Sequence, residues 1–168
     1  TLLPPELGGG IGQALKPKGQ QVEPMATEAA FLTRGVLVND IVKEKVQANE
    51  EVSIQGIIMP DSDHIKQTAD IIVGIIHTPD PSLEPNKWFL YLLDNNGNPI
   101  EQAGQKWEEI IASKVVFKPN VTLSDTQAVN IYQGQLPTGK VEIWFGYRLE
   151  NGTLVFSNVN YPILVMVE

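Results

Sequence analysis

The chain has 168 residues, and its 12 basic and 20 acidic side chains give a formal net charge of −8. This length suits one domain, or one domain with an arm. The acidic excess argues against a protein that binds the nucleic-acid backbone, and no apolar run approaches the ~20 residues that a membrane-spanning helix needs. The absence of cysteine excludes disulfides, thiolate zinc sites and a cysteine nucleophile.

Residues 1–30 differ in composition from the rest, and we expect an extended N-terminal arm ahead of a domain that spans residues 31–168. Within residues 7–15, four positions of nine are glycine, which disfavours a helix. In an extended strand, alternate side chains point to opposite faces. One face then carries Leu7, Gly9, Ile11, Gln13 and Leu15, and the other carries only glycine and alanine. Such a strand fits closely against another layer, so residues 7–15 are predicted to be a donor strand.

Two alternatives for the arm remain open. The glycine run is also typical of a flexible leader between an export signal and a domain. The arm can equally fold back on its own domain and complete the sheet in cis, and the sequence does not separate this arrangement from insertion into a neighbouring copy.

The body of the chain contains short runs of alternating apolar and polar residues, separated by turn residues, which is typical of β-strands. We expect strands at residues 33–38, 52–59, 71–76, 88–93, 141–148, 154–156 and 161–167. Residues 107–114 have helix-like spacing and are predicted to form a short helix or a crossover loop. The body is therefore predicted to be an all-β, Greek-key antiparallel sandwich of the Ig-like or jelly-roll-like type.

Several strands allow a more detailed expectation. Residues 71–76 are apolar on both faces, which predicts a central strand, and residues 52–59, 71–76 and 88–93 are expected to form one continuous antiparallel unit. Residues 161–167 are also predicted to be interior. The Asn-Gly pair at residue 151 predicts a two-residue hairpin of type I′.

Few residues suggest catalytic or metal chemistry. Asp61, Asp63 and Asp70 are weak candidates for a hard-cation site, because the glycine and terminal glutamate of an EF-hand loop are missing. A solvated turn is the simpler interpretation. His64 and His77 are the two imidazoles available to a catalytic site, and no nucleophile elbow accompanies them. We therefore predict no catalytic residues and no cofactor.

Exposed aromatic side chains could bind a sugar ring. Trp144 and Trp88 are the candidate ligand platform, and Trp144 alternates with the apolar stripe of residues 141–145. The competing interpretation is that Trp144 covers the second face of the sheet or an interface, because aromatic side chains mainly supply buried area.

Two segments carry a resemblance to known proteins. Residues 145–156, with the sequence FGYRLENGTLVF, and residues 59–71, with the sequence MPDSDHIKQTADI, resemble uncharacterised β-sandwich modules of bacterial secreted and cell-surface proteins, over roughly residues 50–168. The resemblance implies an exported, noncatalytic module. The arm looks like a pilin-type donor strand in general plan.

These observations lead to an expected function. We expect a structural subunit of an extracellular bacterial filament or surface assembly, in which residues 7–15 of one copy complete the sandwich of the next. Its partners would be other copies of itself, with no nucleic acid and no membrane span. Since the sequence starts at Thr1 without a leader, we expect an exported product whose signal was removed. The alternative is a noncatalytic module that binds carbohydrate or mediates adhesion within a larger exported protein.

Overall fold

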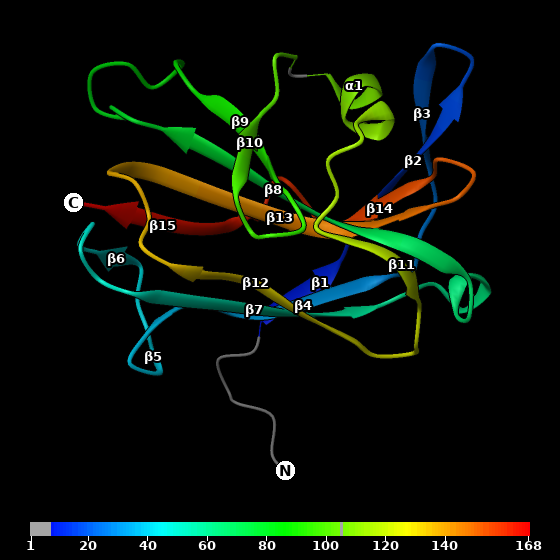
Figure 1. Cartoon of the computed structure of the whole chain (residues 1–168), viewed down its shortest axis with the longest axis horizontal. Helices are drawn as coiled ribbons and strands as arrows, with labels where there is room; N and C mark the ends of the chain where they lie inside the picture. The colour runs from blue at the N-terminus through cyan, green and yellow to red at the C-terminus, as the bar shows by residue number, and fades with distance from the viewer. Residues whose placement is uncertain (1–7, 105) are drawn as a thin grey trace.

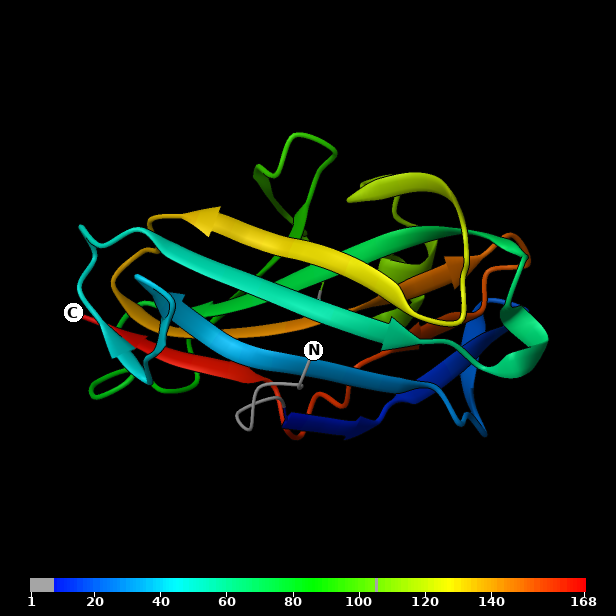
Figure 2. The ribbon, with the colours of Figure 1, turned by 90° about the horizontal axis from the view of Figure 1, so that it is seen from below.

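The computed structural model describes residues 8–104 and 106–168, and it confirms an all-β sandwich of antiparallel sheets (Figure 1). The first sheet, sheet A, has the strand order β1 (Gly8–Ile11), β4 (Ala30–Val38), β7 (Val52–Met59) and β12 (Gln127–Gly134), and the short β5 (Ile41–Val42) also pairs with β4. Figure 2 shows these strands side by side.

The second sheet, sheet B, is larger and lies against the first. Its strand order is β10 (Pro99–Glu101), β9 (Phe89–Leu93), β8 (Thr68–Thr78), β13 (Gly139–Leu149), β14 (Leu154–Phe156), β2 (Gln13–Lys18) and β3 (Gln21–Met25). In addition, β11 (Lys118–Thr122) pairs with β8, and β15 (Ile163–Val167) pairs with β13 on one edge and in parallel with β6 (Lys45–Val46) on the other.

Strands β8 and β13 form the centre of sheet B and are buried on both faces. Their antiparallel ladder runs from the pair Ala69 and Leu149 to the pair Thr78 and Lys140. The inward side chains of both strands join the main core between the sheets, which includes Val73 and Phe145. Their outward side chains join a second apolar cluster under the short helix α1 (Trp107–Ala112). The predicted central strand at residues 71–76 is therefore confirmed.

Some predicted strand pairings are wrong. Residues 52–59, 71–76 and 88–93 do not form one antiparallel unit, because β7 lies in sheet A while β8 and β9 pair in sheet B. The segment between β7 and β8, which includes the 3₁₀ turn η1 (Ser62–His64), carries the chain from one sheet to the other. Because this connection is long enough to reach the other sheet, the consecutive strands β7 and β8 do not have to pair with each other.

Two further details differ from the expectation. The hairpin between β13 and β14 has a three-residue loop, because the Leu149 N–H bonds the Thr153 carbonyl and only Gly152 of the loop has a positive φ, of 91°. A type I turn followed by a left-handed glycine is the usual form of such a loop. Strand β15 is interior on one face only, since Leu164 is 51% exposed on the other.

The short helix at residues 107–112 agrees with one of the two predicted alternatives.

Candidate functional site

The N-terminal segment enters both sheets of its own chain. Strand β1 pairs with β4, with Ile11 opposite Ala30, and strand β2 pairs with β14, with Ala14 opposite Val155. The chain crosses between the sheets at Gly12. The prediction of one strand over residues 7–15 is therefore wrong for the described part, and the pairing seen in this single chain is the cis alternative. Leu7 lies outside the described residues.

Glycine makes this crossing sterically possible. A Cβ atom on Gly12 would lie 2.3 Å from the Phe156 carbonyl oxygen and 2.4 Å from the Phe31 ring. A Cβ atom on Gly9 would lie 1.9 Å from the Phe31 carbonyl oxygen, and Gly9 has a φ of 142°. Gly9 and Gly12, which both need glycine, therefore lie on opposite faces of the predicted strand. Gly9 lies in β1, and Gly12 lies where the chain passes from sheet A to sheet B.

The predicted interface residues have different environments. Ile11 is 57% exposed, whereas Leu15 is partly buried against the cluster under α1. The side-chain carbonyl of Gln13 accepts a hydrogen bond from the Val159 N–H at 3.1 Å. The small residue Ala14, which the pattern placed on the bare face, is buried in the main core.

A groove of about 670 Å³ opens beside β1, between residues of β1 and β4 in sheet A and residues of β13 and β15 in sheet B. Its floor reaches the main core at Phe31, Val36 and Phe145. Exposed apolar side chains line its rim, and of these Tyr161 is 83% exposed. The groove is therefore an apolar surface that continues from the core to solvent.

Two strand edges border this groove, and within residues 8–104 and 106–168 no strand pairs with them there. Because the Gly12 N–H bonds the Ala29 carbonyl, alternation along the antiparallel ladder directs the backbone groups of Gly9 and Ile11 away from β4. Strand β15 pairs with β6 only at Met166 and Val167, so the backbone groups of Leu164 also face the groove. Free edges of this kind are the usual docking sites for an added strand.

Arg34 supplies a cation at the groove. Its guanidinium contacts the Asp40 carboxylate, with an Nη1 to Oδ1 distance of 3.2 Å. Its buried Nε has no hydrogen-bond partner among the residues that the structure describes. A buried donor without an acceptor is costly, so a carboxylate or carbonyl oxygen brought into the groove would be stabilised there.

A connector of residues 26–29 joins β3 to β4 and thereby links the N-terminal strands to the rest of the chain. It is held by the side chain of Asp61. The Thr27 hydroxyl donates to Asp61 Oδ2 at 2.6 Å, and the Glu28 N–H donates to Asp61 Oδ1 at 2.5 Å. The Ala29 N–H in turn donates to the Thr27 hydroxyl at 3.0 Å.

Asp61 is itself fixed to sheet B through Tyr147. The Asp61 N–H donates to the Tyr147 hydroxyl at 3.3 Å, and Nδ1 of His64 lies 2.7 Å from the same oxygen. Burial raises the pKa of Tyr147 well above its usual value, so the phenol stays neutral and keeps its proton to donate. One signal for this contact is present in the sequence, since Tyr147 belongs to the apolar alternating set of its strand.

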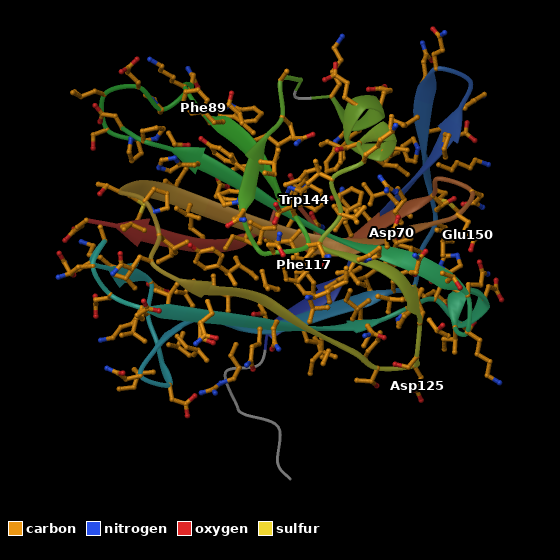
Figure 3. All side chains as sticks on the ribbon, viewed as in Figure 1. Asp70, Phe89, Phe117, Asp125, Trp144 and Glu150 are labelled. Atoms are coloured by element: carbon orange, nitrogen blue, oxygen red, sulfur yellow. The ribbon has the colours of Figure 1, made fainter. Side chains whose placement is uncertain are left out.

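The candidate metal ligands do not converge. Asp61 binds the connector, whereas Asp70 pairs with Arg148 at 3.1 Å and accepts a hydrogen bond from the Asn120 N–H (Figure 3). Asp63 belongs to η1. Within residues 8–104 and 106–168, no three His, Asp or Glu side chains are grouped so as to hold a metal ion.

The predicted tryptophan platform is wrong for Trp144. This side chain is 2% exposed and lies beneath α1, where its ring contacts those of Trp107 and Phe156 (Figure 3). Gly74, its partner in the β8 to β13 ladder, leaves room for the indole, because a Cβ atom there would overlap it. The alternative that Trp144 covers the second face of the sheet is therefore correct. Trp88 is partly buried against the same cluster.

The two histidines lie apart on the fold. His64 contacts Tyr147, whereas Nε2 of His77 lies 2.8 Å from the Thr138 carbonyl oxygen. Each imidazole therefore joins a turn to a strand end.

Comparison of the chain with protein-family models, curated proteins and solved structures found no match. Among the described residues, no helix combines the length and apolar character required to cross a bilayer.

Proposed function

We propose that the protein is a structural subunit of an extracellular filament or surface assembly, and that its N-terminal strands join one copy to the next. In the assembly, residues 7–15 of one copy occupy in the neighbour the place that β1 and β2 occupy in the single chain. Such an exchange of an identical element is a common route from monomers to oligomers. An exchange that does not close on itself produces a filament.

The observation that supports this proposal is the division of a short terminal segment between the two sheets. Strand β1 extends sheet A, and β2 fills a position between β14 and β3 in sheet B. The covalent path from this segment to β4 runs through β3 and the connector. Its strand pairings with β4 and β14 therefore form equally well when the segment comes from another copy.

A disulfide reporter tests the exchange. Ile11 and Ala30 lie opposite each other in the ladder, and the hydrogen bond from Gly12 to Ala29 makes theirs a non-hydrogen-bonded pair. Their Cα atoms are then about 4.5 Å apart, which permits a disulfide. The chain has no other cysteine. We expect the double variant Ile11→Cys with Ala30→Cys to form intrachain disulfides when dilute and a ladder of linked chains when concentrated.

The single variant Ile11→Cys is the control, because it can link two chains at most. Non-reducing electrophoresis reads the products, and electron microscopy of the concentrated sample should show filaments with a regular repeat. Intrachain disulfides at every concentration, without filaments, would contradict the exchange.

A second candidate function rests on the groove. Its apolar floor, its strand edges and the Nε of Arg34, which are unpaired among the described residues, suit an extended peptide of a partner protein that carries a carboxylate among apolar residues. The protein would then be an adhesion module within a larger exported protein. A module of this kind stays monomeric, so the disulfide reporter distinguishes the two functions.

A further inference from the structure

The connector of residues 26–29 is the part of the chain whose path must change if the N-terminal strands move to a neighbouring copy. We propose that Asp61 and Thr27 form a latch that holds this connector in its compact path and so limits the exchange of strands between copies. The inference rests on the proposed function and adds a regulatory contact to it.

The latch consists of contacts that only the compact connector makes. Both carboxylate oxygens of Asp61 are used, one by the Thr27 hydroxyl and one by the Glu28 N–H. The same hydroxyl accepts the Ala29 N–H, which fixes the last turn before β4 begins. Hydrogen bonds to a charged acceptor are among the stronger ones in proteins.

The acceptor side of the latch is rigid. The Asp61 backbone is bonded to the hydroxyl of Tyr147, a fully buried residue in the central strand β13. The His64 ring packs edge-on against the Tyr147 ring, with their centroids 5.6 Å apart. The carboxylate is therefore presented to the connector from the body of the sandwich, which does not move during exchange.

These bonds can set the balance between the closed and exchanged states. In an exchange, the pairings of β1 with β4 and of β2 with β14 are broken in one copy and formed again in another, so they cancel. The contacts of the connector do not cancel, because it must extend to reach the neighbour. Weakening the latch is therefore expected to favour the exchanged state at a given concentration.

The substitution Thr27→Ala tests the latch in the full chain that carries the Ile11→Cys and Ala30→Cys reporter. It removes the hydroxyl that donates to Asp61 and accepts from Ala29. We expect the ratio of interchain to intrachain disulfides to rise at least about tenfold, since the loss of the hydrogen bond to the charged Asp61 carboxylate alone usually has an effect of that size. The conservative variant Thr27→Ser keeps the hydroxyl and should leave the ratio unchanged.

The chain also offers a matched control at Thr33. Its hydroxyl donates to the Gln55 carbonyl at 2.8 Å and accepts the Gly35 N–H at 3.0 Å, so it repeats the bonding pattern of Thr27 outside the connector. The variant Thr33→Ala should therefore destabilise the fold, by somewhat less than Thr27→Ala because its acceptor is an uncharged carbonyl, without changing the disulfide ratio. Urea unfolding of both variants measures the loss of stability in each.

The outcomes separate the latch from the exchange itself. A rise with Thr27→Ala, and none with Thr27→Ser or Thr33→Ala, supports the latch. Equal ratios in Thr27→Ala and Thr33→Ala, with interchain disulfides present, overturn the latch and leave the exchange standing. If none of these chains forms interchain disulfides, the exchange is wrong and the latch is wrong with it.

Discussion

Gly9 and Gly10 are neighbours in β1 but have different surroundings. A Cβ atom on Gly9 would overlap the Phe31 carbonyl oxygen, whereas one on Gly10 would have no atom within 4 Å. We expect Gly9→Ala to lower the free energy of unfolding by about 1–3 kcal/mol, through overlap and through its positive φ. Gly10→Ala should change it by less than about 0.5 kcal/mol, as surface substitutions usually do.

Urea unfolding followed by tryptophan fluorescence measures both variants. Equal losses in Gly9→Ala and Gly10→Ala would show that the close approach of β1 to β4 does not exist in solution.

Tyr147 should make the protein sensitive to alkaline pH. Burial is the main cause that raises the pKa of its phenol, and the nearby Asp61 carboxylate adds to it. In the unfolded chain the phenol titrates near pH 10. Above that pH the unfolded state loses the proton while the folded state keeps it, so stability is fully present below about pH 10 and falls as the pH rises further.

Thermal unfolding between pH 8 and pH 11 measures this effect. We expect a smaller fall in melting temperature for Tyr147→Phe than for the unchanged chain, and some fall should remain, because burial also raises the pKa of Tyr132. The exposed Tyr161 is the control, since Tyr161→Phe removes a phenol that solvent reaches. The interpretation fails if Tyr147→Phe and Tyr161→Phe give the same profile.

At the scale of elements, strands β1 and β2 are part of the sandwich rather than an addition to it. Deletion of residues 1–20 therefore uncovers the pairing edges of β4 and β14 and exposes the buried rings of Phe31 and Phe156. We expect the shortened chain to aggregate, and a synthetic peptide of residues 1–25 to restore solubility when added in trans.

The soluble fraction after centrifugation measures the rescue, with a scrambled peptide of the same composition as control. If the shortened chain alone were as soluble and as stable as the full chain, β1 and β2 would not be integral to the fold.

The sequence predicted the strands better than their partners. Residues 52–59 coincide with β7, and the alternation around Phe145 marks β13, because each of these strands turns alternate side chains toward the main core between the sheets. The sheet to which a strand belongs depends on the path of the preceding turn, which carries no periodic signal. The crossing at Gly12 was missed for the same reason, since it depends on side chains such as Phe156 that are remote in sequence.

The candidate site was less accessible to prediction than the fold. The glycine pattern predicted a close approach of the N-terminal segment to another layer, and Gly9 lies in such a contact. The same pattern predicted that Ile11 is an interface residue, but its side chain is exposed, because a strand at a sheet edge need not bury its apolar face. Arg34 and Thr27 gave no signal. The role of Arg34 arises from its place at the groove, and that of Thr27 arises from its contact with Asp61, and only the folded chain brings these groups together.

At the scale of the whole molecule, the sandwich is closed unevenly. Helix α1 covers the outer cluster on sheet B, whereas the side between β1 and β15 is open at the groove. In the proposed exchange, one copy gives β1 and β2, and the next copy receives them at the edges of β4 and β14, so the giving and receiving surfaces differ. Contacts between unlike surfaces repeat from copy to copy. They produce a filament unless the rotation between copies closes a ring.

The shortness of the connector has a mechanical consequence for such a filament. Residues 26–29 lie between the end of β3 and the start of β4, and four extended residues span at most about 14 Å. Successive subunits would have to sit almost in contact, with little free tether between them. The resulting fibre would resist bending, unlike a string of domains on long linkers, and its stiffness would be determined at the junctions.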